Sequence, residues 1–429
     1  MASFVSDVLS KAAMTRSLEP IGSFVIIEGD SVKRSEFSGK KKNKAKPRIL
    51  YAPGPGDVYG SYIHWINGRH EIKTPTAAYS TMFYELVKRL DADALVLSLQ
   101  KIRFEQQESI SFHFIRQLEA FNKLSYIRSS FATGIRIVFR AMIYRPKYIV
   151  ISTHFPCWTW PLLAIFSTVI LSCHNTFWPQ GILPRKVRKK AKFNYLKFCA
   201  RWLSLAVCTS AECARQISIL TSGRAVCYTE VPQIVARYPL QSRARCRSIL
   251  FLGRIEEDKG VFLLLHAFNI LAPECQDLRL TFAGDGSGTG RLQESISNSN
   301  FKNRINYCGP LDSEGVHNAI SAHDVIVCPT TSRFNEGLGL VGFEAAAHGI
   351  PAIVSSVVPA SELLGESCSV FGVDDLNELV SSIAKLVENP DQYIRKCGAT
   401  GMVRALIYDR RKSWGTCLAF AISKFESEA

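Results

Sequence analysis

Residues 335–351 read Asn-Glu-Gly-Leu-Gly-Leu-Val-Gly-Phe-Glu-Ala-Ala-Ala-His-Gly-Ile-Pro, and this stretch places two carboxylates, Glu336 and Glu344, eight positions apart. The apolar run from Leu340 predicts a helix, and the glycines before it let the backbone approach a ligand closely. The unpaired N–H groups and positive dipole end of that helix would face a bound phosphate. Glu344 would be costly to bury without a partner, and a ribose diol is a suitable one. A solvated Glu344 on an ordinary amphipathic helix is the alternative.

A second stretch, Phe251-Leu252-Gly253-Arg254-Ile255-Glu256-Glu257-Asp258-Lys259-Gly260, lies between a predicted strand and an apolar helix. A loop at the carboxyl edge of a parallel sheet faces the ligand crevice, so Arg254 and Lys259 can converge there on a diphosphate. The alternative is that the adjacent acidic residues neutralise both cations at the surface.

Both stretches belong to an alternation of short apolar runs and helical periodicity that predicts an α/β fold with parallel sheets covered on both faces. In the second half we expect strands at 249–252, 278–283, 325–328 and 352–354, and helices at 262–271, 340–348 and 376–388. In the first half we expect strands at 49–52, 94–99, 148–152, 169–172 and 205–209, and helices at 77–90, 127–144 and 190–203.

The length of 429 residues exceeds what one hydrophobic core usually supports, which favours two domains. We expect a flexible extension over 1–46, a Rossmann-like domain over 47–235, a second over 236–405, and a helix over 406–429 that packs back on the first domain. A hinge is expected near 232–247. Residues 148–173 contain no Lys, Arg, Asp or Glu, but Pro156 and Pro161 interrupt them, so we expect strand, short helix and strand rather than the alternative, a membrane span.

The positive charge is concentrated in the first half of the chain. Residues 1–249 hold 37 Lys+Arg against 15 Asp+Glu (+22), and residues 250–429 hold 15 against 22 (−7). This predicts that the first half faces a polyanion, a solvated basic surface being the alternative. We find no RNA-binding aromatic signature, zinc finger or homeodomain-like helix, so nucleic acid is not the expected partner.

One segment within that half has the pattern of an interfacial helix. Its basic residues are Arg185, Lys186, Arg188, Lys189, Lys190, Lys192, Lys197 and Arg201, and an apolar stripe accompanies them at near-helical spacing: Val187, Ala191, Tyr195, Phe198 and Trp202. The pattern predicts association with an anionic membrane surface. Packing of the stripe on the sheet is the alternative.

Metals, disulfides and secretion are not expected. The 13 cysteines form no C-x-x-C pair or zinc-finger pattern, and residues 1–20 do not resemble a signal peptide, which favours a cytoplasmic location. Asp91-Ala92-Asp93 matches a D-x-D metal motif, but it falls in a predicted helix-to-strand turn, where acidic residues are common.

Three motifs in order resemble the retaining glycosyltransferases of family 4, within group 1 of the glycosyl transferases. They are G-R-x4-K-G from Gly253 to Gly260, the Gly284-Asp285-Gly286 turn, and E-x7-E from Glu336 to Glu344. The resemblance implies a GT-B fold, in which two Rossmann-like domains face a central cleft. It covers 249–388 well and the first half in outline. Val357-Val358 stands where the family usually has a Gly-Gly turn, which puts the identity of the donor in question.

The resemblance also implies roles in the second domain. Arg254 and Lys259 would neutralise the diphosphate of a nucleotide-sugar donor, and Glu344 would hold its ribose. Glu336 would contact the transferred sugar as a catalytic residue. Backbone donors to the diphosphate would come from Gly339, Leu340 and Val341.

In the first domain, His174 ends a predicted strand as the family's sugar-contacting histidine does. A histidine satisfied within the core is the alternative, and His154 is a rival candidate. Gly54 and Gly56 resemble the loop that approaches donor and acceptor. The implied reaction moves a hexose, without a metal or cofactor, to a lipid-linked or polysaccharide-precursor acceptor at the inner face of the cell membrane. A soluble transferase and a non-catalytic sugar-nucleotide-binding protein are the alternatives.

Overall fold

The computed structural model describes residues 46–69, 78–102, 105–117, 121–182, 187–240 and 243–428. The flexible extension expected over 1–46 therefore lies outside the described residues, apart from Lys46. The side chains of 187–189 and the residues 183–186 are also outside them, so the first part of the basic stretch is not described.

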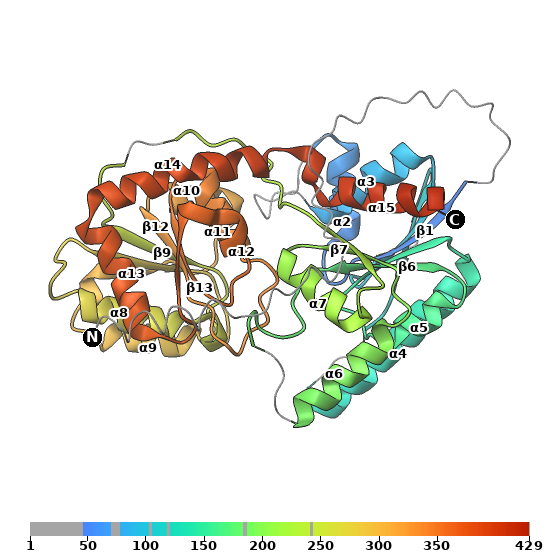
Figure 1. Ribbon diagram of the computed structural model, residues 1–429, viewed down its shortest axis with the longest axis horizontal. Helices are drawn as coiled ribbons and strands as arrows, with labels where there is room; N and C mark the ends of the chain where they lie inside the picture. The colour runs from blue at the N-terminus through green and yellow to red at the C-terminus, as the bar shows by residue number, and fades with distance from the viewer. Residues whose placement is uncertain are drawn as a thin grey trace, which may run out of the picture.

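The chain forms two α/β domains, each built on its own sheet (Figure 1). The first sheet has the order β3-β4-β2-β1-β5-β6-β7-β8, and all its described pairings are parallel except β3 with β4. Its strands are β1 (Arg48–Ala52), β2 (Asp93–Ser98), β3 (Glu105–Gln107), β4 (Ile110–Phe114), β5 (Tyr148–Ser152), β6 (Thr168–Cys173), β7 (Leu205–Cys208) and β8 (Val226–Thr229). The predicted α/β class is confirmed.

The second sheet has the order β11-β10-β9-β12-β13-β14, and every described pairing in it is parallel. Its strands are β9 (Ser248–Leu252), β10 (Arg279–Ala283), β11 (Ile305–Tyr307), β12 (Val325–Cys328), β13 (Ala352–Ser355) and β14 (Cys368–Phe371). In both sheets the strand order reverses next to the first strand, β1 or β9. Ligands of doubly wound folds bind outside the carboxyl ends of the strands at such a point.

Helices cover both faces of each sheet, because the central strands are apolar on both sides. In the first domain they are α2 (Val58–Ile66), α3 (Tyr79–Leu90), α4 (Lys123–Tyr144), α5 (Thr159–Ala164), α6 (Val187–Ala200) and α7 (Ala211–Thr221). In the second they are α8 (Val261–Leu271), α9 (Thr289–Ser297), α10 (Ser313–Ser321), α11 (Leu340–Ala347), α12 (Ala360–Leu364), α13 (Leu376–Glu388) and α14 (Pro390–Ile407).

The chain crosses between the domains twice. After β8 it passes to the second domain, and after α14 it returns to α15 (Trp414–Glu428), which packs against α3, β7 and β8 (Figure 1). The two crossing segments hydrogen-bond to each other, from Val231 N to Lys412 O at 2.9 Å and from Ile234 N to Ile407 O at 3.3 Å. Trp414 is fully buried, with its ring centroid 5.9 Å from that of Tyr51. The last helix therefore completes the core of the first domain.

Residues 148–173 fold as β5, α5 and β6, which confirms the predicted strand, short helix and strand. Both strands are almost entirely buried at the centre of the first sheet. Within the described part of the chain, no helix combines the length and the apolar character needed to cross a bilayer.

Candidate functional site between the two domains

The loop after β9 carries the first cation of the predicted pair. Gly253 has a φ of 151°, and a Cβ on Gly284 would lie 1.8 Å from the carbonyl oxygen of Gly253, so the two loops pack backbone to backbone. Ile255 N donates to Asp285 O at 3.0 Å. The Gly-Asp-Gly turn thus supports the segment that presents Arg254, whose side chain is exposed at the carboxyl edge of the sheet.

Lys259 ends a short 3₁₀ turn, Glu257–Lys259, and its ammonium group pairs with Glu336. The Nζ to Oε2 distance is 2.6 Å, and the two side chains are only 18% and 14% exposed. Gly260, which follows, has a φ of 78°, and a Cβ there would lie 1.9 Å from Pro329 O. That close contact holds the Lys259 turn against the end of β12, directly beside the segment that carries Glu336.

Phe334, which no sequence motif indicated, contacts both of these cations. Lys259 Nζ lies 3.8 Å from the centroid of its ring, and the guanidinium carbon of Arg254 lies 5.2 Å from the same centroid. Thr330 Oγ1 also donates to Glu336 at 3.3 Å. Cation–π contacts of this kind hold two like charges near one another. The structure therefore brings Arg254 and Lys259 together at one aromatic ring, with Glu336 paired to Lys259.

The helix predicted at the second carboxylate is α11, and it begins at the site. Gly339 takes a φ of 91° as its N-cap, and no side chain caps the first turn. The amides of Leu340 and Val341 therefore start a helix that no side-chain acceptor caps. A Cβ on Gly339 would lie 2.5 Å from Val358 Cγ1, so Val358 packs under this turn where the family usually has glycine.

Glu344 lies on the second turn of α11 and is buried, with 8% exposure. Among the described residues no hydrogen-bond partner is found for its carboxylate, and burial raises its pKa to about 7. Burial, together with the charges of Glu336 and Glu344, also raises the pKa of the Cys328 thiol at the end of β12 to about 12. The alternative of a solvated Glu344 is wrong.

His174 follows β6 and faces the second domain. Its Nε2 lies 2.8 Å from Ser172 Oγ, which also accepts a hydrogen bond from Trp414 Nε1 at 2.9 Å. Its Nδ1 is buried with no hydrogen-bond partner in the described part of the chain. Burial lowers the pKa of the imidazole to about 4, so it is neutral near pH 7. A neutral imidazole with one unused nitrogen can hydrogen-bond a sugar hydroxyl.

The other candidates of the first domain stand at neighbouring strand ends. Gly54 follows β1, with a φ of 105°, and a Cβ there would lie 3.1 Å from His154 Cβ. Gly56 is exposed two residues later, with no heavy atom within 4 Å of an added Cβ. His154 follows β5 and is exposed. Since β1, β5 and β6 are adjacent, Gly54, His154 and His174 lie along one edge of the sheet.

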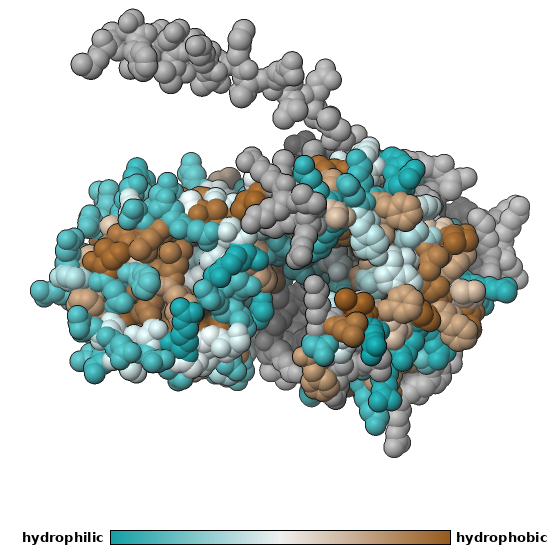
Figure 2. Space-filling model, turned by 90° about the horizontal axis from the view of Figure 1, so that it is seen from below, coloured by the Kyte–Doolittle hydropathy of each residue, from teal (hydrophilic) through white to brown (hydrophobic). Residues whose placement is uncertain are grey.

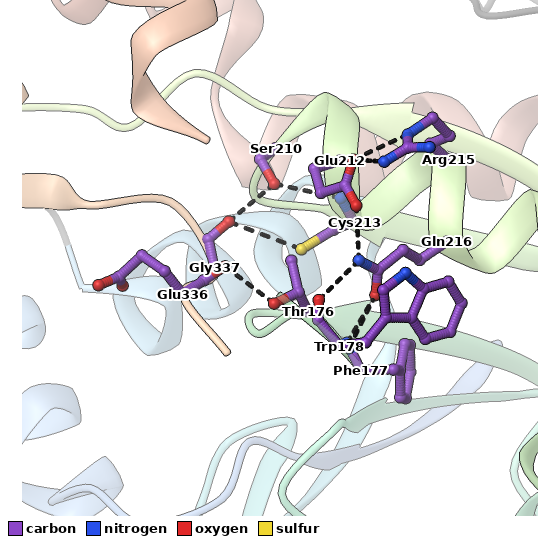
Figure 3. Close-up of polar contacts among 10 residues, drawn as sticks. All are labelled: Thr176, Phe177, Trp178, Ser210, Glu212, Cys213, Arg215, Gln216, Glu336 and Gly337. Carbon is purple, nitrogen blue, oxygen red and sulfur yellow. Dashed lines mark hydrogen bonds and ion pairs between the residues drawn. The ribbon is translucent and has the colours of Figure 1, made fainter. Parts of the chain in front are cut away.

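The segment that carries Glu336 also docks onto the first domain (Figure 3). Thr176 Oγ1 donates to Glu336 O at 3.0 Å, and Ser210 Oγ donates to Gly337 O at 2.7 Å. A Cβ on Gly337 would lie 1.8 Å from His174 O, so only glycine fits there. This contact places His174 next to the segment that holds Glu336.

Gln216 fixes the loop after β6, against which the Glu336 segment packs. It is fully buried on α7, accepts from the backbone N–H of Phe177 at 2.7 Å, and donates to Trp178 O at 2.8 Å (Figure 3). Asn335 Nδ2 in turn donates to Phe177 O at 3.2 Å. The loop after β6 is therefore fixed on both sides, by its own domain and by the opposite one.

Glu230 is a second group that sequence reasoning missed. It is 1% exposed at the end of β8, accepts from Tyr79 Oη at 2.9 Å, and lines an interdomain cavity of about 520 Å³. Its Oε2 has no hydrogen-bond partner among the described residues, and burial raises its pKa to about 8. The ring of Tyr79 lies 4.4 Å from that of His174, centroid to centroid. Glu230 thus supports His174 through Tyr79.

In the described ranges, no group of three or more His, Cys, Asp or Glu side chains is arranged to hold a metal ion. Asp91, in the D-x-D motif, is the left-handed C-cap of α3, and Asp93 begins β2. Lys46 pairs with Asp91 at 2.7 Å. The motif therefore lies in the predicted helix-to-strand turn.

The architecture is that of the GT-B glycosyltransferases, two parallel-sheet domains facing one another. Sucrose-phosphate synthase from Thermosynechococcus elongatus has the same fold, with a TM-score of 0.65 and 16% identity over 89% of this chain and 99% of that one.

Residues 239–401, in the second domain, match the family model for glycosyl transferases group 1. Alpha-D-kanosaminyltransferase from Streptomyces kanamyceticus is 26% identical over 36% of this chain. Lipopolysaccharide core biosynthesis mannosyltransferase LpsB from Rhizobium meliloti is 25% identical over 43% of it. The matched segments span 39% and 59% of the lengths of these two relatives.

Replacement of Glu230 by glutamine should change how stability depends on pH. The folded-state pKa of Glu230 lies above its ordinary value, so wild-type stability falls as pH rises from about 5 through about 8, where the buried acid must ionise. The neutral amide in Glu230→Gln removes this loss. Each pKa unit is worth about 1.4 kcal/mol, so the variant should gain on the order of a few kcal/mol relative to wild type across that range.

Urea unfolding at the two ends of that pH range measures the difference. Glu388→Gln, at an exposed position on α13, is the matched control and should follow wild type at both pH values. Equal pH dependence of wild type and Glu230→Gln would show that Glu230 does not hold its proton as described.

Proposed function

We propose that the chain is a retaining hexosyltransferase that uses a nucleoside-diphosphate sugar and acts on a lipid-linked or polysaccharide-precursor acceptor at the cytoplasmic face of a membrane. The observation that carries the proposal is the convergence of two cations, Arg254 and Lys259, on Phe334, beside the Glu336 carboxylate. Cationic groups beside a helix start that lacks a side-chain cap make a site for a diphosphate. In this proposal Glu344 binds the ribose diol, which would supply the partner that its carboxylate lacks.

Charge development supports the proposed chemistry. Cleavage of the bond to the diphosphate builds negative charge on the leaving phosphate, which Arg254, Lys259 and the start of α11 would stabilise. These groups supply the positive charge at the leaving phosphate without a metal. Glu336 and the unused nitrogen of His174 would orient the sugar. We favour front-face attack with retention, in which a donor phosphate oxygen takes the proton of the acceptor hydroxyl.

The membrane location draws support from α6. In the apolar stripe predicted there, Ala191, Tyr195, Phe198 and Trp202 are exposed, while Leu196 and Cys199 pack inward. The stripe therefore does not pack on the sheet, and the exposed Lys190, Lys192, Lys197 and Arg201 surround it. An apolar stripe with basic neighbours is the pattern of a helix that lies at a lipid surface.

Two other functions share the same nucleotide site. One is a soluble transferase that acts on a small molecule or a protein, and the other is a sugar-nucleotide-binding protein without turnover. Glu336→Gln distinguishes binding from catalysis: an enzyme loses donor turnover while it keeps the nucleotide, whereas a sensor shows no turnover in either form.

Removal of either cation should weaken binding of nucleoside diphosphates. A hydrogen bond to a charged group contributes about 1.5–3 kcal/mol, so Arg254→Met and Lys259→Met should each raise the Kd of UDP or GDP about tenfold to hundredfold. The uncharged nucleoside should bind all forms equally weakly. Calorimetry measures the Kd, and a thermal-shift screen first selects the base, since ligand at about 100 times its Kd stabilises by about 2.7 kcal/mol.

Arg279→Met, at the exposed opposite end of β10, is the control for those variants and should bind as wild type. Wild-type affinity for the diphosphate in both Arg254→Met and Lys259→Met would contradict the proposed site.

Affinity for the nucleotide sugar should rise with pH up to about 7. The pKa of Glu344 is about 7 without ligand, and ribose hydroxyls donate to its ionised form, so protonation at lower pH opposes binding. Below that pKa, the Kd should increase by up to about tenfold per pH unit in wild type. Glu344→Gln should bind more weakly at neutral pH and lose this dependence, and Glu388→Gln should keep it. The same slope in Glu344→Gln as in wild type would assign the titration to another group.

A further inference from the structure

The long helix α4 exposes an apolar face that the sequence analysis did not single out. Leu124, Ile127, Phe131, Ile135, Phe139 and Met142 recur every three or four positions, so they lie on one side of the helix, and all six are exposed. Phe131 is 56% and Phe139 57% exposed, whereas Ile137 and Ala141 on the opposite side are fully buried. A surface helix normally shows the reverse arrangement. From Leu124 to Met142 this face extends along α4 for about 27 Å.

The apolar face continues over two neighbouring helices. α5 packs against both α4 and α6 and exposes Leu162, and Ile165 and Phe166 are exposed directly after its end. α6 adds Tyr195 and Phe198, and Trp202 follows it two residues after its end. All three helices lie at the lower right edge of the molecule in Figure 1, and the view from below in Figure 2 shows hydrophobic side chains on this domain. We call this surface the α4–α6 face.

The charge of the segment that builds the α4–α6 face has one sign. No Asp or Glu occurs between Glu119 and Glu212, and fourteen Lys or Arg residues stand in that interval. On α4, Arg128 is exposed next to the apolar residues, and Arg145 is exposed at the end of the helix. Long basic side chains beside apolar surface reach lipid phosphates while their stems remain in the apolar layer. A uniformly basic face is best matched by a uniformly negative surface. An anionic bilayer has such a surface, whereas a protein of ordinary composition carries charges of both signs, so the observations favour the bilayer.

A cavity links this face to the candidate site. It has a volume of about 430 Å³ and lies between α6 and the turn before Glu336, with Phe177, Trp178, Phe193, Lys192, Arg333 and Asn335 in its lining. Aromatic walls with a lysine and an arginine suit a chain that carries a phosphate. A molecule held in the bilayer under α6 would therefore meet the site through this cavity.

We propose that the α4–α6 face docks on an anionic phospholipid bilayer, with the apolar side chains of α4 and α5 among the acyl chains, and that the cavity beside α6 admits a lipid phosphate acceptor. This inference rests on the proposed function for the identity of the acceptor alone. The docking itself can be measured without nucleotide.

Vesicle co-sedimentation of the full chain tests the docking. Wild type should bind vesicles of phosphatidylcholine mixed with phosphatidylglycerol, bind phosphatidylcholine alone much less, and release when salt is raised. The triple variant Ile135→Ser, Phe139→Ser, Met142→Ser should lose binding by about a hundredfold or more, because each replacement removes apolar surface that would be buried among the acyl chains. All three positions are exposed, so the fold is retained.

The matched control replaces three exposed apolar residues of the second domain, Ile270→Ser, Ile394→Ser and Met402→Ser, and should bind vesicles as wild type does. Thermal shifts with UDP or GDP should be the same in all three proteins, which separates failure of docking from failure of the nucleotide site.

Three outcomes would overturn the proposal. In the first, wild type does not bind the anionic vesicles. In the second, the α4 triple variant binds them as wild type does. In the third, the control variant loses as much binding as the α4 variant. Light scattering adds a fourth: an α4 variant that turns a dimer into a monomer without loss of vesicle binding would assign the face to contact between copies of the chain.

Discussion

The close approach of Gly337 to the carbonyl oxygen of His174 is the constraint on which the site depends. The carboxyl ends of the two sheets face each other, and at this point the backbone of one domain lies directly against that of the other. A Cβ on Gly337 would lie 1.8 Å from His174 O. Hydrogen bonds from Thr176 and Ser210 fix the same segment. Because Glu336 precedes Gly337 and α11 begins at Leu340, this single contact sets the place of a carboxylate and a helix start relative to the first domain.

The need to pair buried charges explains why Lys259 and Glu336 lie together beside that contact. Lys259 and Glu336 are both largely shielded from water, and each would be costly to leave unpaired. Their ion pair stabilises the arrangement without ligand, and the ring of Phe334 holds Lys259 beside Arg254. A diphosphate would offer Lys259 a second anion and free Glu336 for a sugar hydroxyl. The buried Glu344 has no such partner among the described residues, and burial raises its pKa to about 7.

Much of the fold and part of the site could be predicted from the sequence. Apolar runs located the central strands, since a buried parallel strand is apolar on both faces, and short edge strands such as β3 and β11 were missed for lack of that signal. Glycines flanking charged residues marked Arg254, Lys259 and Glu336. Phe334 could not be found, because an aromatic residue in an irregular turn has no periodicity. The contact of Glu230 with Tyr79 joins positions 151 residues apart, which no local pattern reveals. The stripe on α6 was visible, but periodicity alone does not say which face of a helix points inward.

A crystal structure with a bound nucleoside-diphosphate sugar, selected by the thermal-shift screen, would show whether the nucleotide occupies the proposed site. We expect diphosphate oxygens within hydrogen-bond distance of Lys259 Nζ and of the backbone N–H of Leu340 or Val341, and ribose hydroxyls on Glu344. The sugar would lie between Glu336 and His174. A nucleotide bound elsewhere, with the ion pair of Lys259 and Glu336 unchanged and Glu344 still without a partner, would contradict the proposed site.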